Sequence, residues 1–265
     1  FLSMKITSLQ NAAIKNIVKL AKSKERKEQQ LFVIEGAREL SLALAGGYII
    51  DSVYVCTQIF AKSKYPDVVD SIVRDKIFTI SPAVFEKIAY RENSDGIVAV
   101  AKPKSHGLAD IKLSANPFVI VLESVEKPGN LGAILRTADA AAVDAVVVCD
   151  PQTDLYNPNV IRSGVGTLFT VQTAVCTSSE AMEWLQQNKI TSYAAELQAA
   201  EFYQDVDFTH PSAIIMGTEA EGLSDFWLQN AEKRIKIPMR GKIDSLNVSV
   251  SAAILTFEAM RQRGF

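Results

Sequence analysis

The residues best placed to do chemistry lie in three short stretches in the second half of the chain. Each stretch follows an apolar run that predicts a strand, and each leads into a helix. The first contains Asn130 and Arg136, the second contains Glu219, and the third contains Ser245 and Asn247. Loops that follow parallel strands meet at one edge of a sheet, where open α/β folds bind ligands. The three stretches are therefore the candidate functional positions of the chain.

The first stretch, EKPGNLGAILRTADA at 126–140, predicts a helix that opens with its amide groups facing a ligand. Asn130 suits an N-cap, and Gly132 lets a chain or ligand approach closely. Arg136 lies six residues beyond Asn130 in an otherwise apolar helix. An ordinary capped helix with a snorkelling arginine explains the same pattern, so both interpretations stay open on these residues alone.

The second stretch, AIIMGTEAEGLS at 213–224, predicts a buried strand that ends at Gly217 and a helix capped by Ser224. Between them lie Glu219 and Glu221. Paired carboxylates suit acid and base catalysis, although acidic residues in such a loop are often simply solvated.

The third stretch, at 235–260, predicts a strand, a loop and a helix that opens between Ser245 and Asn247. The helix is rich in serine and alanine, which allows close backbone packing. One of its faces carries Val250, Ile254, Phe257 and Met260.

Several other chemistries lack the residues that they need. The three cysteines, Cys56, Cys149 and Cys176, have no CxxC or CxxH spacing, which argues against a zinc site or a disulfide framework. The two histidines lie in turn-like SHG and THP segments and offer little for a triad or a metal centre. The dinucleotide, P-loop and esterase motifs are absent. We therefore expect no metal cofactor.

Charge is distributed unevenly, although the net charge is only -2. Residues 1–102 carry 15 Lys and Arg against 11 Asp and Glu, whereas residues 103–265 carry 13 against 19. Within thirteen residues of the first part stand Lys15, Lys19, Lys22, Lys24, Arg26 and Lys27. Such a density neutralises several phosphates and predicts RNA binding, with a solvated helix face as the alternative.

The elements that position these residues form two α/β domains. Alternating helical and strand patterns predict a small domain at 1–102, a Pro- and Gly-containing linker at 103–116, and a parallel-sheet domain at 117–265. Segment 23–30 is expected as a turn, 66–74 as a helix and 167–173 as a strand. No apolar run is long enough to cross a membrane, and the amino-terminal residues do not resemble a signal peptide, so we expect a cytoplasmic protein.

Taken in order, the three stretches closely resemble the signature motifs of the SpoU/TrmH family of RNA ribose 2'-O-methyltransferases in the SPOUT superfamily. The resemblance covers about 117–263. It matches Asn130 and Arg136 to the first motif, Glu219 to the second, and the Ser245 to Asn247 segment to the third. Residues 23–44 also resemble the substrate-binding domain of ribosomal-RNA members, which is similar to kink-turn-binding ribosomal proteins.

The resemblance implies a carboxy-terminal SPOUT trefoil-knot domain that uses S-adenosylmethionine and dimerises. The substrate implied is ribosomal RNA of the 23S type. A tRNA methyltransferase, a catalytically silent RNA-binding member and a small-molecule α/β enzyme are the alternatives. The residues expected around the cofactor are Ala195, Gly217, Ile237, Met239, Ser245 and Leu246, and those expected on RNA are Lys22, Lys24, Arg26 and Lys27.

The same resemblance implies a role for each catalytic residue. Because a guanidinium is a poor base, we expect Arg136 to act as an electrostatic clamp on a phosphate and the developing alkoxide. Asn130 would anchor the loop or substrate, Glu219 would hold Arg136 or Asn130, and Asn247 would orient the third-motif loop. One position departs from the family pattern: Ala142 stands where a glycine is usual after the first-motif helix. A positive φ there would strain the alanine by roughly 1 kcal/mol or more.

Overall fold

The computed structural model describes residues 5–90, 94–218 and 220–264 of the 265-residue chain. Its contacts divide the chain into two compact units. Unit 1 comprises Phe1–Lys104 together with Asp154–Thr170, and unit 2 comprises Ser105–Thr153 together with Val171–Phe265. The chain thus leaves unit 1 after Lys104, close to the start of the predicted linker at 103–116. The linker itself stays a prediction. It also returns to unit 1 once, for a segment that the sequence analysis assigned to the second domain.

Unit 1 is built on a five-stranded mixed sheet with the order β1-β4-β3-β5-β2. The strands are β1 (Lys5–Ile6), β2 (Phe32–Glu35), β3 (Ile50–Val55), β4 (Ile77–Ile80) and β5 (Ile97–Ala101). The helices are α1 (Ala12–Lys19), α2 (Ser23–Gln29), α3 (Ala37–Ala45), α4 (Thr57–Phe60), α5 (Pro82–Ile88) and α7 (Pro158–Ser163). Helices α1 and α5 bury Ile14, Ile17, Val84 and Phe85 in one core cluster with Val98 of β5.

Three sequence expectations in unit 1 were wrong. Segment 23–30, expected as a turn, contains helix α2, because Lys, Glu, Arg and Gln are good helix formers. Segment 66–74, expected as a helix, forms only the short 3-10 turn Pro66–Val69 before a second one at Arg74–Lys76. Segment 167–173, expected as a strand, instead begins with a 3-10 turn, Thr167–Phe169.

That last difference has a tertiary cause. Gly166 has φ 85°, which turns the chain sharply just before Thr167–Phe169. The turn directs the Phe169 ring into an aromatic cluster of unit 1, where its centroid lies 6.1 Å from that of Phe32 and 5.0 Å from that of Tyr48. Burial of this ring overrides the local strand pattern, and the next strand begins only at Thr173.

Unit 2 is built on a seven-stranded sheet with the order β10-β12-β9-β11-β6-β7-β8, in which every pairing is parallel. The strands are β6 (Phe118–Glu123), β7 (Ala145–Cys149), β8 (Thr173–Cys176), β9 (Thr191–Ala195), β10 (Glu201–Phe202), β11 (Ser212–Met216) and β12 (Lys233–Lys236). The predicted parallel α/β architecture is therefore confirmed.

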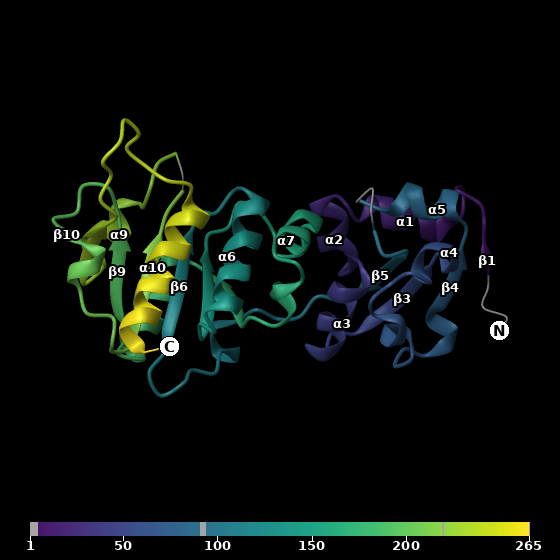
Figure 1. Ribbon diagram of the computed structural model, residues 1–265, viewed down its shortest axis with the longest axis horizontal. Coiled ribbons are helices and arrows are strands. Elements are labelled where there is room, and N and C mark those ends of the chain that lie inside the picture. Colours follow the sequence, from purple (N-terminus) through teal and green to yellow (C-terminus); the bar gives the residue numbers. More distant parts are fainter. Residues whose placement is uncertain (1–4, 91–93, 219, 265) are drawn as a thin grey trace. The chain divides into compact units, whose positions relative to one another are not determined.

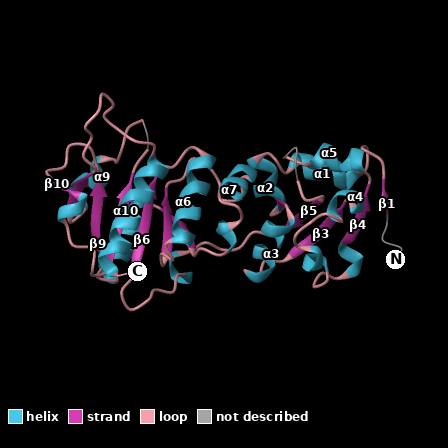
Figure 2. Cartoon of the chain, in the orientation of Figure 1, coloured by secondary structure: helices cyan, strands magenta, loops and turns pink. Residues whose placement is uncertain are grey.

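Helices cover both faces of the unit 2 sheet. They are α6 (Pro128–Ala140), α8 (Ser178–Gln187), α9 (Asp225–Asn230) and α10 (Val248–Arg263). Helices α6 and α10 lie side by side across one face (Figures 1 and 2). Helices α8 and α9 bury Leu185 and Trp227 against Val121, Val147 and Ile215 of the opposite face. Central strands buried on both sides explain the continuous apolar runs in the sequence.

The end of α6 contains the strained alanine that the sequence analysis anticipated. Ala142 has φ 49°, and its side chain is exposed. A left-handed conformation brings Cβ close to the following carbonyl, which glycine avoids. We expect Ala142→Gly to raise the free energy of unfolding of unit 2 by about 1 kcal/mol, measured by urea denaturation.

Ala140 provides the matched control, because it is also exposed but lies within α6. Ala140→Gly is expected to lower the stability by about 0.5–1 kcal/mol. Equal destabilisation by both substitutions would show that the backbone at Ala142 is not strained.

Candidate active site

A cavity of about 430 Å³ lies where β9, β11 and β12 end. It collects residues from the second and third sequence stretches and from the end of β9, as expected for loops that follow parallel strands. Among its lining residues are all of those predicted to surround the cofactor: Ala195, Gly217, Ile237, Met239, Ser245 and Leu246. The structure therefore brings this predicted set together in one place.

One wall of the cavity is a tight loop that follows β11. The amide of Thr218 donates to the Gly222 carbonyl at 3.1 Å, and the amide of Gly222 donates to the Thr218 carbonyl at 3.0 Å. A Cβ atom on Gly217 would lie 2.0 Å from the Gly222 carbonyl oxygen. Only glycine permits this closure, so Gly217 serves the site through its lack of a side chain. Glu219 lies outside the residues that the structure describes.

A second wall is the start of α10. Asn247 is the N-cap of this helix, and its Oδ1 accepts the Ser249 amide at 2.9 Å. Its Nδ2 donates to Oδ1 of Asn130 at 3.1 Å. The first and third stretches therefore meet through two side chains that are 117 residues apart in the chain. One sequence detail was wrong: α6 begins at Pro128 with Lys127 as N-cap, so Asn130 lies within the first turn.

A smaller cavity of about 70 Å³ adjoins the first one beside Asn130. The two cavities share lining from Gly217, Thr218, Ala220 and Val248. The smaller one is also bordered by Glu123 and Lys127. A ligand in the larger cavity and a group entering the smaller one would therefore be separated only by the loop after β11 and the first turn of α10.

The sequence analysis missed Glu123, a buried carboxylate at the end of β6. Its Oε2 accepts the Ser224 amide at 2.8 Å, and its Oε1 accepts the Ser224 hydroxyl at 2.6 Å. Ser224 is the N-cap of α9, but its hydroxyl bonds to Glu123 instead of capping its own helix. Glu123 thus fixes the end of the loop that forms the cavity wall. The signal in the sequence that could have identified Glu123 is an acidic residue at the end of a long apolar strand.

Arg136 lies on the exposed surface of α6. Its side chain is exposed on α6, and it makes no hydrogen bond or ion pair with any residue that the structure describes. It lines neither the 430 Å³ nor the 70 Å³ cavity. The exposed guanidinium is therefore accessible to an external anion.

The predicted RNA-binding cluster divides into two parts. Lys22, Lys24 and Lys27 are exposed, and Lys24 forms only a 3.7 Å ion pair with Glu28 on the helix surface. Arg26 departs from the prediction, because its side chain is only 5% exposed.

Four of the five N–H donors of the Arg26 guanidinium are used inside unit 1. It makes a bidentate ion pair with Asp154 and donates to the carbonyls of Leu20 and Ala21. These contacts fasten the 154–170 segment to the amino-terminal elements of the same unit. Arg26 is thus a buried residue that holds unit 1 together.

The described part of the chain shows neither a candidate metal cluster nor a candidate membrane-spanning helix. No group of three His, Cys, Asp or Glu side chains there is arranged to hold a metal ion. No helix in that part is both long and apolar enough to cross a membrane.

Cys149 and Cys176 lie opposite each other on β7 and β8, where hydrogen bonding between the thiols and burial raise the pKa of Cys149.

The fold and the cavity define a class: a parallel α/β domain that holds a ligand in the loops at the carboxyl ends of its strands. A sequence model of the SpoU rRNA Methylase family matches residues 117–257, and one of the MRM3-like substrate binding domain matches residues 11–99. The chain belongs to the SpoU rRNA methylase family, and its first unit is similar to that substrate-binding domain.

Relatives extend this similarity over the full chain. The 23S rRNA (guanosine(2553)-2'-O)-methyltransferase RlmP of Bacillus subtilis is 29% identical over 95% of this chain and 97% of its own. A crystal structure of an RNA 2'-O ribose methyltransferase matches with a TM-score of 0.87 and 38% identity, over 99% of this chain and 100% of its own. An AdoMet-bound rRNA methyltransferase from Sinorhizobium meliloti matches with a TM-score of 0.88 and 27% identity, over 98% of both chains.

Proposed function

We propose that this protein methylates a ribose 2'-hydroxyl of ribosomal RNA, of the 23S type, with S-adenosylmethionine as the methyl donor. The observation that carries the proposal is the 430 Å³ cavity, which gathers every residue predicted to surround the cofactor. The similar Sinorhizobium meliloti structure contains AdoMet, and the similar Bacillus subtilis enzyme acts on 23S rRNA.

The cavity residues suit an adenosine-containing cofactor. Ile237, Met239 and Leu246 supply apolar surface for a flat ring, and Gly217 lets the ligand approach the backbone. Ala195 and Ser245 complete the proposed contacts. The bound cofactor would supply an electrophilic methyl group on its sulfonium, and the remaining work falls to side chains that position the RNA hydroxyl.

The substrate hydroxyl is proposed to enter beside the 70 Å³ cavity. There Asn130 and Asn247 hold each other, so both amides are fixed in orientation before the RNA arrives. Arg136 contributes an exposed, planar cation that clamps a backbone phosphate and the developing alkoxide. Glu219 keeps its proposed role of holding Arg136 or Asn130. Positioning a desolvated nucleophile in line with the methyl group supplies much of the rate.

Two further properties of the assembly are part of the proposal. The segment between β12 and α10 is proposed to form a trefoil knot, supported by the internal position of β12 between β10 and β9. The active form is proposed to be a homodimer through unit 2, since α10 exposes Val250 and Phe257. Light scattering at micromolar protein would then give twice the 29.0 kDa of one chain.

The proposed compartment is the cytoplasm, where ribosomal RNA is available.

The function is tested with unmodified 23S rRNA transcripts and S-adenosylmethionine, followed by mass mapping of the RNA. The expected product is a single 2'-O-methylated nucleotide in the ribosomal transcript. Methylation of tRNA instead would replace the substrate, and cofactor binding without methylation of either RNA would indicate a catalytically silent member.

The exposed lysines of α2 and its N-cap are expected to contact the RNA backbone. Changing Lys22, Lys24 and Lys27 together to glutamine should weaken RNA binding and reduce the slope of log K against log salt concentration by about 2 to 3. Cofactor affinity should not change. Arg26 is left intact because it is buried.

A second triple variant removes the same charge elsewhere in unit 1, at the exposed residues Lys5, Lys62 and Lys64. Its salt slope is expected to stay close to that of the wild type. If both variants change the slope equally, the lysines around α2 contribute only general charge.

A further inference from the structure

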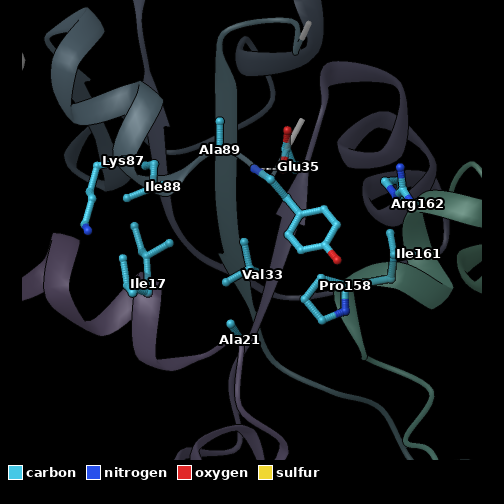
Figure 3. Close-up of a pocket in the computed structure, with 12 residues that line it drawn as sticks. Ile17, Ala21, Val33, Glu35, Lys87, Ile88, Ala89, Pro158, Ile161 and Arg162 are labelled. Carbon is cyan, nitrogen blue, oxygen red and sulfur yellow. Dashed lines mark hydrogen bonds between the residues drawn. The ribbon is translucent and has the colours of Figure 1, made fainter. Parts of the chain in front are cut away.

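Unit 1 contains an apolar pocket of about 160 Å³ at the edge of its sheet. Figure 3 shows its walls: Ile17 and Ala21 come from α1 and the turn after it, Val33 from the edge strand β2, and Pro158 and Ile161 from α7. All of these residues belong to unit 1, and none of them lines either cavity of unit 2. The pocket is therefore separate from the proposed catalytic site.

The rim of this pocket carries an exposed aromatic ring. Tyr90 is 60% exposed, although it contributes to the lining. Its amide donates to Oε2 of Glu35 at 2.6 Å, shown by the dashed line at Glu35 in Figure 3. The backbone that carries the ring is thus attached to strand β2, while the ring itself stays accessible.

A guanidinium faces that ring. Cζ of Arg162 lies 5.6 Å from the centroid of the Tyr90 ring, within the range of a cation–π contact. The Arg162 side chain is exposed, and its Nε and Nη2 both donate to Oδ1 of Asn159, at 3.2 and 2.9 Å. Two planar groups, one aromatic and one cationic, are therefore held at the mouth of an apolar pocket.

Cations outnumber anions at the pocket, because Lys87 and Arg162 line it together with one carboxylate, Glu35. The exposed Lys19 and Lys22 directly follow the lining residues Val18 and Ala21 in the chain. This arrangement suits a polyanion that carries apolar, planar groups. Single-stranded RNA is such a ligand, since its unstacked bases pack on aromatic rings and guanidinium planes while its phosphates attract lysines.

The size of the pocket agrees with this ligand. Its volume is close to that of an engineered apolar cavity of about 150 Å³ that binds benzene. One six-membered ring therefore fits, and a nucleobase enters either as a pyrimidine or by the six-membered ring of a purine. We propose that this pocket, called the base pocket below, binds one unstacked base of the RNA substrate. The proposal rests on the proposed function only for the identity of the RNA as substrate.

The test uses the full chain and two dodecamers, oligouridine and an abasic ribose-phosphate strand of equal length. The wild type is expected to bind oligouridine about tenfold more tightly than the abasic strand, because stacking of a base adds to the phosphate contacts. Tyr90→Ala should abolish this difference, whereas Tyr90→Phe, which keeps the ring, should retain it. Because Tyr90 is 60% exposed, its replacement is expected to leave the fold intact, which circular dichroism verifies.

A second variant blocks the base pocket without removing any group. Ala21 is exposed and lines the wall, so Ala21→Leu fills part of the volume. It should lower the affinity for oligouridine and leave the affinity for the abasic strand unchanged. In both pocket variants the salt slope should stay at the wild-type value, in contrast to the triple lysine variant, because no phosphate contact is lost.

Two outcomes overturn the inference: equal binding of the two strands by the wild type, or an equal loss for both strands in Tyr90→Ala. The inference would also be wrong if the pocket bound an apolar peptide and the protein showed no preference for oligouridine over the abasic strand. The proposed function is judged separately by methylation of ribosomal transcripts by the wild type. A wild type that methylates RNA while Tyr90→Ala still prefers oligouridine contradicts only the base pocket.

Discussion

Arg136→Ala is expected to lower kcat/KM for RNA methylation about 30- to 1,000-fold. This range corresponds to a loss of roughly 2 to 4 kcal/mol of transition-state stabilisation, the scale seen when one preorganised donor is removed from a developing oxyanion. The expectation follows from the position of Arg136 on α6, where the side chain is exposed and makes no contact with any described residue that would explain it structurally.

The role expected of Arg136 is that of a cationic donor. Guanidinium groups are not deprotonated in proteins, so the group stabilises negative charge on the phosphate and on the developing alkoxide. Arg136→Lys should recover little activity, because an ammonium is a point charge that cannot form two parallel hydrogen bonds with one phosphate. This variant is the matched control for charge alone.

Cofactor binding separates this role from a structural one. Arg136 lines neither cavity, so the affinity for S-adenosylmethionine should stay within about twofold in Arg136→Ala, as measured by calorimetry. The exposure of Arg136 means that its removal leaves no buried group without a partner. A folded Arg136→Ala protein that methylates RNA within about threefold of the wild type would remove Arg136 from the mechanism.

The features that the sequence predicted correctly are set by local patterns. Helix α5 has local signals at its start, because Pro82 is its first residue and the Ser81 hydroxyl accepts the Val84 amide. Strands β6, β7 and β11 of unit 2 are apolar at nearly every position because both faces of the central parallel sheet are covered. The positive φ of Ala142 was raised as a condition by the family resemblance, because the family usually has glycine at this position.

The features that the sequence did not reveal depend on partners far away in the chain. In the sequence, Arg26 is indistinguishable from the other cations of the basic segment. Its pairing with Asp154, 128 residues later in the chain, shows that its side chain has a structural role. The same pairing explains why 154–170 packs in unit 1. Similarly, the contact between Asn130 and Asn247 requires that α6 and α10 pack against each other, which no local pattern encodes.

Gly217→Ala is expected to weaken the binding of S-adenosylmethionine about 10- to 100-fold. The added methyl would lie 2.0 Å from the carbonyl oxygen and 2.1 Å from the carbonyl carbon of Gly222, and 2.4 Å from the Leu223 amide nitrogen. All three atoms are backbone, so no side chain can rotate away. The loop closed by Thr218 and Gly222 must shift, and overpacking of this kind costs about 1–3 kcal/mol.

Two other glycines of the same region distinguish a steric clash from a general sensitivity to alanine. Gly241 has open space around it and no positive φ, so Gly241→Ala should bind the cofactor as the wild type does. Gly222 also has open space but φ +70°, so Gly222→Ala should show only backbone strain of about 1 kcal/mol. If calorimetry finds Gly217→Ala folded and within threefold of the wild-type affinity, the cofactor does not depend on the loop that closes against Gly217. The 430 Å³ cavity would then lose its assignment as the cofactor site.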